Sequence, residues 1–172
     1  MDERRTQFES AYEAEFDYVW NALRRFGVPE RDLKDVCHDV FIVVYRKWDE
    51  YDSDRPLRPW LYGIAYRVAS DYNKKASNKR ESLSDPDPPT EQPGVYDKLS
   101  KERARDVVME ALQHVDLERR AVFVMSELDG HAMPEVSEAL SLPLNTAYSR
   151  LRFAREEFEE AVASIVDEEV RG

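Results

Sequence analysis

The sequence has one cysteine, five glycines and no long apolar run, and each scarcity excludes a class of protein. A single Cys excludes an internal disulfide framework and a cysteine-based zinc site. The low glycine count and a mean hydropathy of −0.70 argue against a β-barrel built on glycine turns. No stretch approaches the ~18 apolar residues that would cross a membrane, and the start lacks the apolar core of a secretory signal. We therefore expect a soluble, cytoplasmic protein with no membrane insertion.

Basic residues are gathered in two short stretches of an otherwise acidic chain, whose formal charge is −11 over 172 residues. Residues 62–80 contain five Lys and Arg against one Asp, and residues 143–155 contain three Arg and no acid. Because charges are screened over ~10 Å, a phosphate backbone responds to these stretches rather than to the total. On charge alone, two solvated helix faces explain the pattern equally well.

Apolar residues recur at helical spacing through the chain, and no segment alternates as a strand does. Helices are expected at residues 8–26, 31–48, 57–79, 99–112, 117–128, 134–140 and from 144 onward. Gly27 and Pro29 should end the first of them. Leu128 and Leu144 are counted among the side chains that face the core. The last helix either ends before the acidic tail or continues into it.

A proline-rich acidic segment, residues 81–95, divides these helices into two groups. It reads ESLSDPDPPTEQPGV and holds four prolines and four acids. Proline removes a backbone donor and disfavours helix at the residue before it. The sequence therefore predicts an all-α protein with two small helical domains, residues 1–80 and 96–172, joined by a flexible linker.

The second group of helices has the pattern of a helix-turn-helix. A short helix, the turn 141–143 and a helix that carries Arg but no acid follow one another. At about 100° per residue the apolar residues of the last helix share one side, which is the division a DNA-reading helix needs. The opposite side and its flanks carry Asn145, Thr146, Tyr148, Ser149, Arg150, Arg152, Phe153 and Arg155. The alternative is an antiparallel helical hairpin with a charged rim.

At two places the residues follow the pattern of one family. The second group matches at Glu118, Arg119, Arg120, Asp129, Gly130, Glu135, Thr146, Ser149, Arg150, Leu151, Ala154 and Arg155. With these residues, the stretch 115–155 resembles the fourth conserved region of the extracytoplasmic-function (ECF) sigma factors of bacterial RNA polymerase. In the first group, residues 32–41 resemble that family's polymerase-binding helix, and residues 59–65 resemble its promoter-melting helix. Both matches, in this order and separated by a proline-rich segment, carry the resemblance.

The resemblance implies a transcription initiation factor with no catalytic residues and no cofactor. Such a factor binds core RNA polymerase, at the coiled coil of the largest subunit and at the flap, and directs it to promoter DNA. The first domain would bind polymerase and recognise and melt the minus-ten element, and the second would recognise the minus-thirty-five element. An anti-sigma partner is an expectation of the same kind.

The resemblance also assigns residues. The polymerase-binding face of the second helix would be Asp35, Asp39, Ile42 and Arg46, which step along a side outside its core stripe. The start-proximal element would meet Trp60, Arg67, Lys74, Lys75, Lys79 and Arg80, with Tyr62 and Tyr66 nearby. A core position is favoured for Trp60 over a stacking platform. A flipped base would sit in the loop 52–58.

In the last helix, matching position makes Tyr148, Ser149, Arg152 and Phe153 the base readers and Thr146, Arg150 and Arg155 the phosphate contacts. The three histidines are scattered without ligand spacing, so no metal site is expected, and Cys37 is expected to serve packing. The competing interpretation is an autonomous helix-turn-helix regulator. It would need a dimer interface or a ligand pocket, and the sequence signals neither.

Overall fold

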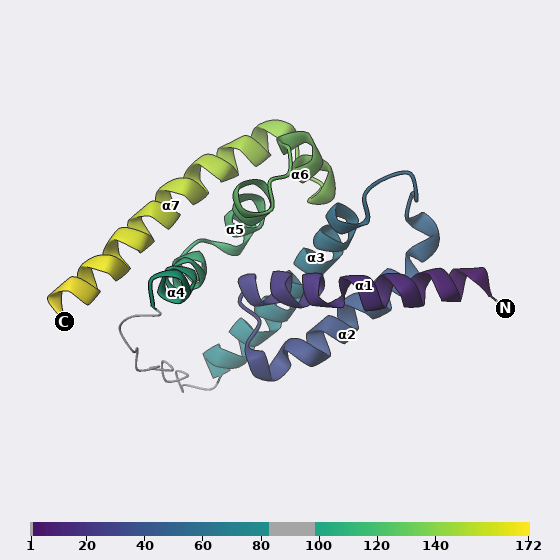
Figure 1. The fold of residues 1–172 in the computed structure, drawn as a ribbon, viewed down its shortest axis with the longest axis horizontal. Coiled ribbons are helices and arrows are strands. Elements are labelled where there is room, and N and C mark those ends of the chain that lie inside the picture. Colours follow the sequence, from purple (N-terminus) through teal and green to yellow (C-terminus); the bar gives the residue numbers. More distant parts are fainter. Residues whose placement is uncertain (1, 83–98) are drawn as a thin grey trace.

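A computed structural model describes residues 2–82 and 99–172, and the regular structure in these two stretches is helical (Figure 1). Its elements are α1 (Glu3–Arg25), α2 (Glu30–Arg46), the 3-10 turn η1 (Trp48–Glu50), α3 (Leu57–Ser82), α4 (Leu99–Gln113), α5 (Leu117–Phe123), the π-turn η2 (Val124–Leu128), α6 (Met133–Ala139) and α7 (Leu144–Arg171). The all-α prediction is confirmed. The predicted linker, residues 81–95, lies outside the described residues except for Glu81 and Ser82, which end α3.

Helices α1, α2 and α3 form a first module around their predicted apolar stripes. The carboxylate of Asp2 accepts the Arg4 N–H over 3.2 Å and caps α1. Gly27 follows the helix end with φ of 89°, a conformation that costs glycine little. The buried side chains of this module include Val19, Leu23, Phe26, Leu33, Val36, Val40, Val44, Leu61, Ile64 and Ala65.

Helices α4 to α7 form a second module, in which one predicted helix is interrupted. The predicted helix 117–128 is α5 followed by the π-turn η2, where the Asp129 N–H donates to the Val124 carbonyl over 2.9 Å. The wider turn rotates the residues within it out of α-helical register, and Leu128 is the last of them. Leu128 is therefore 42% exposed, and its predicted core position is wrong.

Helix α7 runs to Arg171, so the acidic tail continues the helix. Its second half packs through Ala161 and Ile165 on Ala111 of α4. The first residue of α7, Leu144, is 42% exposed, which contradicts its predicted place in the core. It stands at the helix end, one turn before the buried Ala147, and so extends beyond the packed part of the helix.

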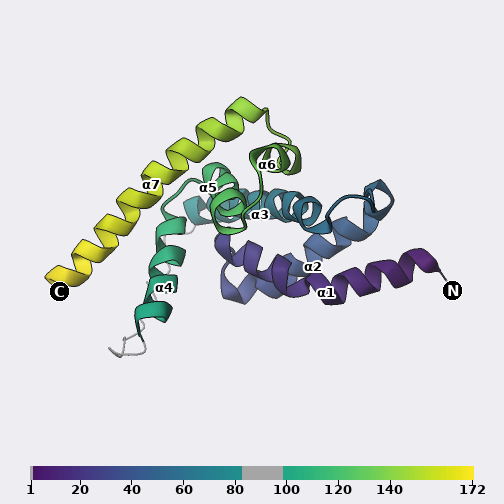
Figure 2. The ribbon, with the colours of Figure 1, turned by 45° about the horizontal axis from the view of Figure 1, so that its top comes forward.

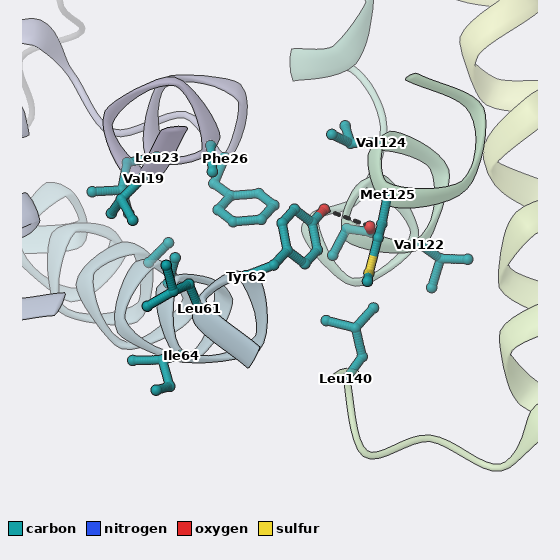
Figure 3. Close-up of a cluster of buried hydrophobic side chains, with 14 of the residues drawn as sticks. Val19, Leu23, Phe26, Leu61, Tyr62, Ile64, Val122, Val124, Met125 and Leu140 are labelled. Carbon is teal, nitrogen blue, oxygen red and sulfur yellow. Dashed lines mark hydrogen bonds between the residues drawn. The ribbon is translucent and has the colours of Figure 1, made fainter. Parts of the chain in front are cut away.

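The two modules share one large hydrophobic cluster, and the second module adds a small cluster between α4 and α7. Figure 2 shows α5 and α6 beside α3, and Figure 3 shows Tyr62 of α3 reaching across to α5. The fully buried Tyr62 hydroxyl donates to the Ala121 carbonyl over 2.6 Å. On the same helix, a Cβ built on Gly63 would overlap the carbonyl oxygen of Ala139 in α6. Glycine at this position therefore allows the backbones of α3 and α6 to meet.

A buried arginine adds polar contacts between the modules. Arg120 of α5 donates through Nη2 to the Val115 carbonyl over 2.8 Å and through Nη1 to the Arg25 carbonyl over 3.1 Å. Its Nη1 also donates to Oε1 of Gln113 over 3.2 Å. Burial lowers the pKa of Arg120. The guanidinium thus satisfies a carbonyl at the end of α1, where the helix itself supplies no partner.

Candidate nucleic-acid interface

The exposed side of α7 is the candidate DNA-reading surface of the second module. Its inner side packs Ala147, Leu151 and Ala154 into the core, because these residues recur at helical spacing. The opposite side is in solvent and holds Asn145, Tyr148, Ser149, Arg152, Phe153 and Arg155, while Thr146 and Arg150 are half-buried. Tyr148 is the most open of the large side chains among them, at 52% exposed. The division into two faces is as predicted; contact with DNA stays a prediction.

Two of the predicted phosphate contacts on this helix are paired with acids. Arg150 Nη2 lies 3.5 Å from Oε2 of Glu118 on α5. Arg155 Nε donates to Oε1 of Glu127 in η2 over 2.6 Å. A phosphate would have to replace these carboxylates, so the neighbouring acids compete with nucleic acid for the arginines.

The candidate DNA surface of the first module is only partly open. Arg67, Lys74 and Lys75 are exposed along α3, and Lys79 and Arg80 continue the helix. Tyr62, which the sequence placed near DNA, is buried under α5, so it offers no stacking platform. Tyr66 is half-buried against Phe26, with the ring centroids 5.9 Å apart.

Trp60 lies in an aromatic group at the start of α3. Its ring centroid is 5.1 Å from that of Tyr51 and 6.2 Å from that of Trp48. Trp60 is half-buried and packs against the core, which agrees with the position favoured for it.

A cavity of about 570 Å³ opens beside the loop where a flipped base was predicted. From the first module it is lined by Tyr51, Asp52, Arg55, Trp60 and Arg67, among others. From the second module Glu138 and Ser141 line it, and Glu138 pairs with Arg55. The predicted base site is therefore bordered by the helix-turn-helix of the same chain.

The predicted polymerase-binding face of α2 is open. Asp35, Asp39 and Arg46 are exposed, and Ile42 among them is 49% exposed. Tyr45, adjacent to Arg46, is a further exposed apolar side chain that the prediction did not include. A small apolar centre within a charged rim is the usual composition of a protein-binding patch.

Sequence reasoning missed Gly63 and Arg120 as the residues that join the modules. A signal for Gly63 was available, since glycine inside a helix lowers the stability of that helix by about 1 kcal/mol relative to alanine. A glycine at such a position therefore indicates a packing reason, such as the close approach of another backbone. Arg120 gave no comparable signal, because its burial depends on carbonyls from distant segments.

The described residues contain no helix with both the length and the apolarity needed to cross a membrane. Nor do three or more His, Cys, Asp or Glu side chains gather as a metal site would require in this part of the chain. Cys37 is buried in the first module, and burial raises the pKa of its thiol to about 11. It is therefore a packing residue with an unreactive thiol.

Two family models match the chain in the same order as the two modules. Sigma-70 region 2 matches residues 11–79, and Sigma-70, region 4 matches residues 105–158. These matches define a factor of the sigma-70 class.

The curated relatives are more specific. The chain is 29% identical to the RNA polymerase sigma factor NccH of Alcaligenes xylosoxydans xylosoxydans over 139 residues, 78% of this chain and 75% of the relative. It is 29% identical to the ECF RNA polymerase sigma-E factor of Escherichia coli K12 over 150 residues, 81% of this chain and 78% of that one.

Solved structures agree. CnrH in complex with the cytosolic domain of CnrY matches with a TM-score of 0.65 at 25% identity, covering 93% of this chain and 90% of that one. The sigma factor RpoE in complex with the anti-sigma factor NepR from Bartonella quintana matches with a TM-score of 0.72 at 14% identity, over 91% of this chain and 97% of the other. The latter supports the fold alone. The chain belongs to the ECF sigma factors, which bind core RNA polymerase and direct it to promoters.

Proposed function

We propose a division of this sigma-factor activity between the two modules. In the first, α2 binds core polymerase and α3 binds the start-proximal promoter element. In the second, α7 reads the upstream element as duplex. The observation that carries the proposal is the two-sided character of α7: a buried apolar side, and an exposed side with three arginines and no acid over residues 143–155. We further propose that the protein acts in the cytoplasm and is not an enzyme.

The upstream element fits the exposed side of α7 chemically. Arg152 can reach a base edge, where guanine accepts two hydrogen bonds from a guanidinium. Arg150 and Arg155 can exchange Glu118 and Glu127 for phosphates. This exchange weakens binding to free DNA, and it suits a factor that engages promoters only together with polymerase.

The polymerase fits α2 for a different reason. Ile42 supplies an apolar contact that has no partner in solvent, and Asp35 and Asp39 supply a negative rim. A basic helical surface on polymerase complements both features.

The closed packing of the modules has to open for promoter binding. The minus-ten and minus-thirty-five elements are separated by about two and a half helical turns, roughly 85 Å of duplex. In the closed form, Arg67 on the first candidate surface donates to Oγ of Ser141, in the turn before α7, over 2.9 Å. We propose that polymerase selects the open form. Because CnrH, which is 25% identical to this chain, has a solved structure with the cytosolic domain of CnrY, we also propose that an anti-sigma protein binds this chain.

Reconstitution with core RNA polymerase tests the assignment, with the positions of transcript starts read by sequencing. Arg152→Ala should lose preference for the upstream element and keep polymerase binding. Asp39→Ala combined with Ile42→Ala should lose polymerase binding and keep the fold. If both variants bind core polymerase as the unchanged protein does, the α2 assignment is wrong. If the unchanged protein binds promoter DNA alone and ignores polymerase, it is an autonomous regulator.

A further inference from the structure

Phe153 is a large, partly exposed apolar side chain that lies among the arginines of α7. We propose that Phe153 is a positioning residue: its ring stacks with the guanidinium groups of Arg119 and Arg152 and thereby presents Arg152 to a guanine edge. This inference rests on the proposed function of α7 as the reader of the upstream element. It replaces the expectation that Phe153 itself touches a base.

The geometry places both cations on one ring. The guanidinium carbon of Arg119, from α5, lies 5.2 Å from the Phe153 ring centroid, and that of Arg152 lies 5.0 Å from it. Both distances are within the ~6 Å range of cation–π attraction. Phe153 is only 39% exposed although it lies on the open side of α7. The ring is therefore occupied by arginine before any DNA arrives.

Arg119 is itself fixed, so it can act as a support. Its Nη1 pairs with Oε1 of Glu157, which stands one turn beyond Phe153 on α7. Oε2 of Glu157 also accepts the Asp116 N–H over 3.3 Å, at the N-terminal end of α5. Ring and carboxylate together hold the Arg119 side chain between the two helices.

Arg152 differs from the other arginines of the helix in its partner. Arg150 and Arg155 are paired with acids from α5 and η2, whereas no ion pair of Arg152 is recorded in residues 2–82 and 99–172. A long side chain that is already stacked loses less conformational freedom when it binds, and its planar fork matches the two acceptors of guanine. The Phe153 ring therefore favours one orientation of Arg152, the arginine that is free of an acidic partner within the described residues and can read a base.

Run-off transcription with core polymerase and a set of promoters varied at each upstream position tests the proposal. The unchanged protein should prefer guanine at one position, and Arg152→Ala should lose that preference. Phe153→Leu should reduce it about two- to five-fold, the factor that corresponds to a cation–π contact of about 0.5–1 kcal/mol. Phe153→Tyr, which keeps the ring, should restore it. Arg119→Met should reduce it by a smaller factor, and Lys101→Met on α4 is the matched loss of a charge.

The double variant separates positioning from direct reading. If Phe153 acts through Arg152, Phe153→Leu adds nothing once Arg152→Ala is present. Additive losses, or a Phe153→Leu effect confined to a thymine position, would overturn the proposal and restore the ring as a base reader. Thermal unfolding of each variant identifies any loss that comes from the fold. If transcription by the unchanged protein does not depend on the upstream sequence, the proposed function of α7 is wrong. That result differs from additive losses in the double variant, which would overturn only the positioning role of Phe153.

Discussion

The candidate DNA surfaces on α3 and α7 differ in what covers them. On α7 the side chains opposite the core point into solvent, and Tyr148 and Arg152 are open. On α3 the nearby Tyr62 is buried beneath α5, and Arg67 is bonded to the turn that precedes α7. The second module therefore presents its candidate DNA surface in the closed form. In the first module, α5 and the turn before α7 cover part of the candidate DNA surface on α3.

Under the proposed function, the interface between the modules covers part of the α3 surface and also sets where the α7 surface lies. Contacts that hold α5 and α6 against α3 also place the start of α7 beside Arg67. In the open form that we propose, release of these contacts would free the α3 surface and let α7 move away along the DNA. The variants below loosen the interface by decreasing amounts, and each asks whether the two surfaces respond as one unit.

The largest effect is expected at Arg120, whose guanidinium joins α5 to the end of α1. Arg120→Met keeps most of the volume but leaves the buried Val115 carbonyl without its side-chain donor, and it removes one of the two side-chain donors to the Arg25 carbonyl, the other being Gln113. We expect the free energy of unfolding to fall by about 2–4 kcal/mol in a urea titration. Arg119→Met, which removes the half-buried neighbouring guanidinium, should cost under about 1 kcal/mol. Equal losses for the two variants would show that the buried arginine does not hold the modules.

The next effect is expected at Gly63, where the modules meet backbone to backbone. Gly63→Ala would place a methyl group on the Ala139 carbonyl, and overpacking of this kind costs about 1–3 kcal/mol. In the open form the same change favours α3 by about 1 kcal/mol, because alanine is the better helix former. The variant should therefore open the molecule, seen as a larger radius of gyration in solution scattering.

Two controls accompany Gly63→Ala. Ser77 lies on the exposed side of α3, so Ser77→Ala should leave the radius of gyration unchanged. Cys37 should stay protected from alkylation at pH 8, since its pKa is about 11 and the α1–α3 core remains closed around it. Reaction of Cys37 would mean that the first module unfolds, and an unchanged radius would mean that α3 and α6 do not meet in solution.

A smaller effect is expected from the buried hydroxyl of Tyr62. Tyr62→Phe removes the bond to the Ala121 carbonyl and keeps the ring packing against Phe26. We expect a loss of about 1 kcal/mol in the free energy of unfolding, since that carbonyl also accepts the Val124 N–H within its own helix. Tyr66→Phe, one turn along α3, is the matched control and should cost less. The reverse order would place the closing contact at Tyr66 and not at Tyr62.

These residues also show where the sequence stops being informative. Periodicity predicts a helix and its buried side when one stripe faces one core, as Leu33, Val36 and Val40 do on α2. Helix α3 is buried on a second side, and no pattern within the helix distinguishes Tyr62 under α5 from an aromatic residue near DNA. Leu128 was misplaced for a local reason, because a π-turn changes the register that a 3.6-residue period assumes.

The smallest effect on stability and the clearest separation of roles are expected at Arg67. Its bond to Oγ of Ser141 is exposed, so both Arg67→Ala and Ser141→Ala should change the free energy of unfolding by less than about 0.5 kcal/mol. In the open form the two residues differ, because a guanidinium on α3 can meet phosphate and a serine in the α6–α7 turn does not face the same DNA. Arg67→Ala should therefore weaken promoter opening several-fold with core polymerase, and Ser141→Ala should leave it unchanged. Equal effects on opening would mean that Arg67 acts only through the contact between the modules, and the α3 surface would have to be placed at Lys74 and Lys75.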